Sequence, residues 1–321
     1  MTPASSVLLL TTLTGFGYGL LAWVGILAAF GLVPPAPLFL PVAVVVALAF
    51  ANAGLTASMA HLGHPERAWR AFSQSRSSWL SREGVASLIT FPPALAFAAL
   101  WWVLGPDAVA TRILGLIAAS LGLVTVGCTA MIYASLKPIR QWRTGWTPAA
   151  YLLLGHWSGA LIAIAVAVGY GGEPVSWAWL AAGLGVAALL VKLGYWHHGA
   201  ADRGGKSALT LEQAIGVPQG VRPPGVSVAQ ARLFDAGHTQ RTFLTDEFVF
   251  RIARQHAQAL RGAALALGFG IPLIWLATGP RHWAAAASVA VLAIVGLLAE
   301  RWLFFSDARH TVRLYHGDAR T

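Results

Sequence analysis

The stretch FLPVAVVVALAFANAGLTASM, residues 39–59, is long enough to cross a lipid bilayer and carries no charged side chain. A hydrocarbon core about 30 Å thick requires about 20 predominantly apolar residues in an α-helix. The strands of a membrane barrel would instead show alternating polar and apolar residues over about ten positions. The continuous apolar run therefore predicts a transmembrane helix.

Seven further stretches share this length and composition. Only 11% of the 321 residues are charged, whereas soluble domains have about 25%. The sequence thus predicts an all-α integral membrane protein, a bundle of eight transmembrane helices in a single membrane-anchor domain over residues 1–321. The predicted spans are about 7–31, 37–60, 84–104, 112–135, 148–170, 175–198, 260–278 and 282–305.

The basic residues lie mostly on one side of the predicted bundle. Only Arg112 and Arg281 fall near the four short connections, which leaves 20 of the 22 Lys and Arg residues on the side that holds both termini. Because cytoplasmic loops collect Lys and Arg, both termini are predicted to be cytoplasmic, in a multi-pass protein of the inner (cytoplasmic) membrane. This distribution accounts for the net charge of +10 without a nucleic acid partner.

Residues 199–259 form the longest predicted connection, on the cytoplasmic side. They mix Gly, Pro and charge with one helical pattern, TDEFVFRIARQHAQALR, in which Thr245 is the predicted N-cap. Loops of this length in a compact protein are usually functional. With the basic charge on this side, the segment is predicted to be a docking surface for a partner protein.

The connection over residues 61–83 brings His61 and Glu83 back to one membrane face, because His61 follows the second span and Glu83 opens the third. A quinone needs a proton source at its carbonyls, at a depth where its tail stays in lipid. A histidine and a carboxylate at the membrane boundary suit that chemistry. The alternative is structural: Glu83 neutralises Arg82 and caps the third helix, while His61 ends the second.

The same connection, HLGHPERAWRAFSQSRSSWLSRE, resembles the signature of the DmsC-like membrane-anchor subunit of dimethyl-sulfoxide-reductase-type complexes, a branch of the polysulfide-reductase-type anchors. GWTP (145–148) and AERWLFF (299–305) agree in order and position, so the resemblance covers nearly the whole chain. The long segment 199–259 is more similar to the anchor of quinone-linked sulfite dehydrogenases.

The resemblance implies an enzyme of three parts, in which a molybdopterin subunit performs the substrate chemistry and an iron–sulfur subunit transfers electrons. This chain would hold both at the membrane and exchange electrons with ubiquinone or menaquinone. The family's quinone-site residues correspond to His61 and Glu83, and Trp79, Arg82 and Tyr133 are further candidates. The lone Cys128 fits this division, because a Cys-ligated iron–sulfur cluster cannot be built within the chain.

The expected reaction is sulfite oxidation coupled to quinone reduction. The first alternative reverses the direction, with quinol oxidised and an S-oxide or N-oxide reduced. A membrane transporter is an alternative of another class. The sequence shows neither the paired broken helices nor the several mid-membrane charges that many transporters have.

Three groups of polar residues lie within or beside the predicted spans. Glu300 and Arg301 would be costly facing lipid, so they are predicted to face the interior, as a structural ion pair or as a proton path to the quinone. His156 is either a core histidine or a haem b ligand; resemblance to haem-free anchors favours the first. Lys192 and His197-His198 are predicted to extend to the interface.

Tryptophans gather at the predicted span ends, where an interfacial belt is the expected role for most of them. These tryptophans are Trp101, Trp102, Trp142, Trp146, Trp177, Trp179 and Trp283.

Overall fold

The computed structural model describes residues 5–34, 36–59, 62, 64–172, 175–203, 255–279, 282–309 and 311. Every regular element within these ranges is a helix, and eight helical spans are long and apolar enough to cross a membrane. The prediction of an all-helical membrane bundle is confirmed.

The spans follow the predicted ranges to within a few residues, except at the start of the third and the end of the sixth. The first six are α1 (Ser5–Ala29), α2 (Phe39–Met59), α3 (Trp79–Leu104), α4 (Val109–Ala134), α5 (Trp146–Gly169) and α6 (Val175–Arg203). The seventh, Ala257–Thr278, comprises α10 (Ala257–Leu265), a π-helical turn η3 (Ala266–Gly270) and α11 (Ile271–Thr278), and the eighth is α12 (Trp283–Ser306). A short 3₁₀ helix, η1 (Pro65–Gln74), lies between α2 and α3, where the sequence predicted only a loop.

Helix α3 begins at Trp79 because Ser78 caps it. The Ser78 hydroxyl oxygen accepts a hydrogen bond from the backbone N–H of Ser81 at 3.4 Å, which satisfies one of the free donors of the first turn. Glu83 therefore lies in the second turn of α3 instead of at its start, and the prediction that Glu83 opens the helix is wrong.

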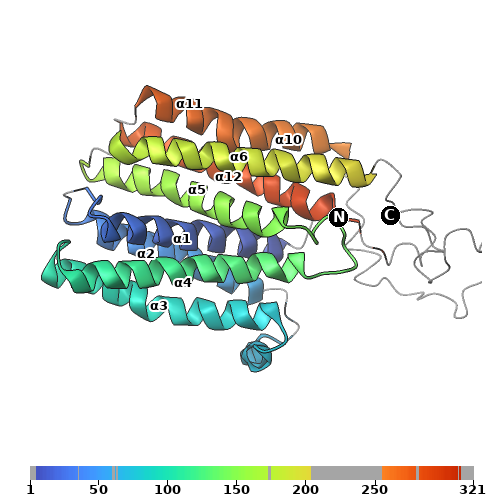
Figure 1. The fold of residues 1–321 in the computed structure, drawn as a ribbon, viewed down its shortest axis with the longest axis horizontal. Helices are drawn as coiled ribbons and strands as arrows, with labels where there is room; N and C mark the ends of the chain where they lie inside the picture. Colours follow the sequence, from blue (N-terminus) through green and yellow to red (C-terminus); the bar gives the residue numbers. More distant parts are fainter. Residues whose placement is uncertain are drawn as a thin grey trace, which may run out of the picture.

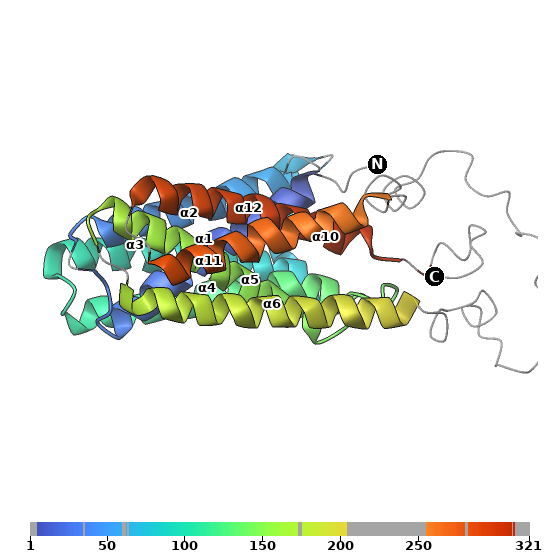
Figure 2. The ribbon, with the colours of Figure 1, turned by 90° about the horizontal axis from the view of Figure 1, so that it is seen from above.

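The helices run side by side along the long axis of the molecule (Figure 1), and the seventh span, α10 and α11, lies at the edge of the bundle and packs against both α12 and α6 (Figure 2). The start of α1, the end of α12 and η1 all lie at one end of the bundle. We call this the η1 end. Its assignment to the cytoplasm stays a prediction. Most of the predicted docking segment, residues 204–254, lies outside the described residues, as does its Thr245 cap.

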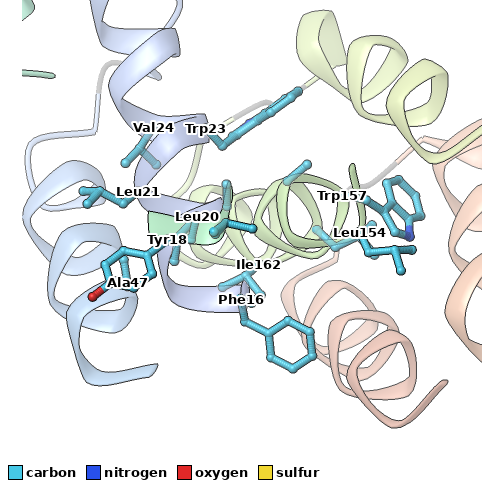
Figure 3. Packing of buried hydrophobic residues seen from close by; sticks show 14 of the residues in the cluster. Phe16, Tyr18, Leu20, Leu21, Trp23, Val24, Ala47, Leu154, Trp157 and Ile162 are labelled. Carbon is cyan, nitrogen blue, oxygen red and sulfur yellow. The ribbon is translucent and has the colours of Figure 1, made fainter. Parts of the chain in front are cut away.

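Helix α1 forms the centre of the bundle, and its buried side chains, such as Leu21 and Trp23, point to different sides (Figure 3). Glycines let α5 approach it closely. A Cβ atom at Gly19 would overlap the carbonyl oxygen of Gly155, and one at Gly159 would overlap the backbone of Gly19. Small residues at such crossings are typical of helix pairs that associate in membranes.

The π-helical turn in the seventh span accepts a hydrogen bond from α5. Trp157 donates from its indole N–H to the carbonyl oxygen of Gly268 at 2.9 Å, and its ring points toward this span in Figure 3. A π turn shifts the helical hydrogen-bond pattern, so the Gly268 carbonyl is available to a side chain of another helix.

The predicted tryptophan belt is only partly present. Trp102, Trp146, Trp179 and Trp283 are exposed on the bundle surface, as the prediction requires. Trp101, Trp142 and Trp177 are buried, and the prediction is wrong for them. Two of these indoles donate hydrogen bonds to interior carbonyls, Trp101 to Pro37 at 3.3 Å and Trp142 to Phe304 at 3.0 Å.

Candidate functional site

A cavity of about 790 Å³ opens at the η1 end, between α2 and α3. Leu10 of α1 and Tyr133 of α4 lie at its inner side, and η1 contributes Ala71 and Phe72. On the outer side, Met59, Leu80 and Leu88 are 42%, 52% and 56% exposed on the bundle surface. The volume is typical of small-molecule sites, and an apolar tail could leave between α2 and α3 toward lipid.

Glu83 lines this cavity with its side chain almost fully removed from solvent. The residue is 3% exposed, and the Thr129 hydroxyl donates to its Oε1 at 2.6 Å. Within the part of the chain that the structure describes, no Lys or Arg lies within ion-pair distance of this carboxyl group. The helix cap and the Arg82 pairing of the structural alternative are not observed for Glu83, because Ser78 caps α3 and Arg82 has other partners.

Arg82 and Trp79 organise the connection before α3. The Arg82 guanidinium donates to the carbonyl oxygens of Ser75 and Arg76, both at 2.8 Å, and lies 4.3 Å from the centre of the Trp79 ring. Neither side chain lines the cavity. Their predicted place in a quinone site is not supported by this geometry; they hold the loop in place.

The histidine that lines the cavity in the described structure is His64, since His61 lies outside the described residues. His64 Nδ1 is 2.9 Å from Glu66 Oε1, and its side chain is 67% exposed. His64, Arg67 and Ala71 recur at intervals of three or four residues, a spacing that puts them on one helical face. That periodicity could have revealed the η1 contribution, which the sequence interpretation missed.

Helix η1 lies directly on α3 because residue 84 is glycine. A Cβ atom at Gly84 would come within 2.9 Å of the Phe72 ring. The pairing places the polar residues of η1 beside the first turns of α3, so a carboxyl group, an imidazole and a guanidinium all border one apolar cavity.

Tyr133, a candidate from the sequence, lines the cavity and connects it to a second polar region. Its ring stacks on Tyr151 with 5.7 Å between centroids. Tyr151, Glu300 and Arg301 border a small cavity of about 10 Å³, close to the least space that one water molecule needs.

Glu300 and Arg301 face the bundle interior, as predicted, and Lys192 joins them. Lys192 forms an ion pair with Glu300, and their side chains are 1% and 0% exposed. Arg301 Nε lies 3.6 Å from Glu300 Oε2. The prediction that Lys192 extends to the interface is wrong, because Glu300 offers it a carboxylate in the interior; His197 and His198 are exposed.

His156 packs edge to face against Trp23, with 5.2 Å between ring centroids. Its Nδ1 atom has no hydrogen-bond partner among the described residues. The described part of the chain also holds no group of three His, Cys, Asp or Glu residues that could bind a metal ion. A haem at His156 is not tested by this geometry.

The site can exchange protons with a bound molecule, because a carboxyl group and an imidazole border one apolar space. It is built by residues far apart in the chain, of which the sequence singled out Glu83 and Tyr133 but not the lining residues of α2 and η1.

A family model and one known protein match almost the whole chain. The family model for the DMSO reductase anchor subunit (DmsC) matches residues 6–306. The chain is 35% identical over 341 residues to a sulfite dehydrogenase subunit of Allochromatium vinosum, covering 98% of this chain and 99% of that protein. It is 31% identical over 117 residues to the anaerobic dimethyl sulfoxide reductase chain YnfH of Escherichia coli, covering 35% of this chain and 39% of that one. No solved structure matches.

Proposed function

Because the chain belongs to the family of DMSO reductase anchor subunits (DmsC), we propose that it is the quinone-reactive subunit of a three-part oxidoreductase. One partner carries molybdopterin and the other carries iron–sulfur clusters. The observation that carries the proposal is the position of Glu83, a buried carboxyl group in a cavity that opens on the apolar surface of the bundle. A soluble substrate would not need that opening.

Glu83 is the proton-exchanging group in this proposal. Reduction of a quinone to a quinol consumes two electrons, supplied by the iron–sulfur partner, and two protons. Glu83 gives a proton to the nearer carbonyl oxygen, and the Thr129 hydroxyl holds the carboxyl group toward the cavity by its hydrogen bond to Oε1. The largely exposed His64 at the η1 end is the group through which protons return from water to Glu83. The role predicted for His61, a hydrogen bond to the quinone, is kept.

The substrate of the partner enzyme is proposed from the relative that covers the full chain, the sulfite dehydrogenase subunit. Oxidation of sulfite with water gives sulfate, two protons and two electrons, which matches the demand of one quinone. The shorter match to a dimethyl sulfoxide reductase chain supports the reverse direction as second candidate, with quinol oxidised and an S-oxide reduced.

The proton path through Glu300 and Arg301 is a further proposal. Its support is the Tyr133–Tyr151 stack, since Tyr133 lines the large cavity and Tyr151 borders the small one with Glu300 and Arg301.

We also propose that residues 61–83 and 199–259 dock the iron–sulfur subunit. Within this surface, Trp69 of η1 is 64% exposed.

The Glu83→Gln variant tests the function. The purified complex should keep its activity with a soluble dye, while quinone-linked turnover falls by about 10²-fold, the usual scale for a lost acid–base group. Asp107→Asn, which alters an exposed carboxyl group near the start of α4, is the control and should change neither rate. Equal losses of dye-linked and quinone-linked activity in Glu83→Gln, or no loss in either, would contradict the proposal.

A further inference from the structure

Asn52 is the only asparagine in the chain, and it lies inside the apolar helix α2. It is exposed on the bundle surface and lines the large cavity. Its amide group has no hydrogen-bond partner among the described residues. Polar groups in the hydrocarbon region are costly without a partner, so this amide requires one that the described residues do not provide.

The depth of Asn52 sets it apart from Glu83. Asn52 lies seven residues before Met59, the end of α2, which is about 10 Å along the helix axis. Glu83 lies four residues after the start of α3, which is about 6 Å from the same end of the bundle. The two side chains thus approach the cavity from opposite helices and at different depths.

Ser87 of α3 lies at about the same depth as Asn52, eight residues or about 12 Å from the helix start. It also lines the cavity, and its hydroxyl group is buried beside the hydroxyl group of Tyr18. The inner part of the cavity therefore has polar groups on both of its flanking helices, between apolar residues such as Leu55 and Phe91.

We propose that the side-chain amide of Asn52 donates a hydrogen bond to the quinone carbonyl that is remote from Glu83. The inference rests on the proposed function and adds the group that fixes the orientation of the ring. The flat head lies between α2 and α3, with one carbonyl at Glu83 and the other at the amide of Asn52. A neutral donor suits this end because it binds the carbonyl without introducing a charge into the membrane interior.

The Asn52→Leu variant removes the amide and keeps a side chain of similar shape. It also makes α2 more apolar, so insertion into the membrane is not impaired. The KM for a short-chain benzoquinone or naphthoquinone should rise about tenfold or more, because the variant leaves a buried quinone carbonyl without a hydrogen bond. The kcat should change much less, and dye-linked activity should be unchanged. Asn52→Gln, which keeps the amide, should recover part of the affinity.

Ala53→Leu is the matched control, because Ala53 is the next exposed residue of α2 and does not line the cavity. It should leave KM unchanged. Direct titration of the resting complex with the same quinone, followed by tryptophan fluorescence, should show the same order of affinities as KM.

Unchanged quinone affinity in Asn52→Leu, with Glu83→Gln inactive toward quinone, would overturn this inference and leave the function standing. Unimpaired quinone turnover in Glu83→Gln would overturn the function itself. Loss of dye-linked activity in Asn52→Leu would mean that the amide is needed for assembly of the complex, and it would also overturn the inference.

Discussion

Lys192, Glu300 and Arg301 place two basic groups and one acidic group in the interior of the bundle. Aromatic rings surround the excess positive charge: the Arg301 guanidinium lies 3.7 Å from the Tyr151 ring centre, and Lys192 Nζ lies 4.1 Å from that of Tyr195. Such contacts stabilise cations that are removed from water. The charge that remains in the interior therefore depends on which of the three groups is removed.

Removing Glu300 should destabilise the protein more than removing Lys192. Glu300→Gln removes the carboxylate that lies nearest to both buried cations, and breaking a buried pair in this way costs about 3–5 kcal/mol. Lys192→Met leaves Glu300 and Arg301 as a one-to-one pair and fills the space with an apolar chain of similar length, at a cost of about 1 kcal/mol. Thermal unfolding of the two purified variants measures the order. Equal losses of Tm in the two variants would contradict this account.

At the scale of helices, the α1–α5 crossing depends on the absence of side chains. Gly159→Ala would place a methyl group against the backbone of Gly19, and relief requires the two helices to separate. Overpacking of this kind costs about 1–3 kcal/mol. Gly127→Ala in α4 is the control, because no neighbouring atom lies within 4 Å of its new Cβ. It should be neutral or stabilising, since alanine favours helix. Thermal unfolding in detergent measures both, and a control as unstable as Gly159→Ala would refute the packing argument.

The helical spans could be predicted from the sequence because apolar length alone defines them. The start of α3 could have been predicted too, since Ser78 is a good N-cap, but the apolar run suggested a later start. The π turn at Gly268 could not, because the indole that pairs with its carbonyl oxygen, that of Trp157, comes from another helix. Glu83 was recognised from its local signature. Asn52 was not, because its importance arises only where α2 and α3 border a common cavity.

For the whole molecule, the direction of insertion is the main prediction still to be measured. The described start of α1 and end of α12 lie at the same end of the bundle, and 20 of 22 basic residues were assigned to that side from the sequence. An alkaline phosphatase fused after Thr321 should be inactive and a fluorescent protein at the same position active, because the C-terminus is expected in the cytoplasm. Active phosphatase at this position would reverse the orientation, and with it the side on which the partner subunits dock.

The opening between α2 and α3 also determines how the protein would meet its substrate. A quinone that enters there arrives by lateral diffusion in the bilayer and never from bulk water. The concentration that governs saturation is then the number of quinones per lipid, and the volume of the surrounding solution is irrelevant to it. Any enzyme in the same membrane that reduces or oxidises the same pool competes with this one, or supplies it, without physical contact between the two.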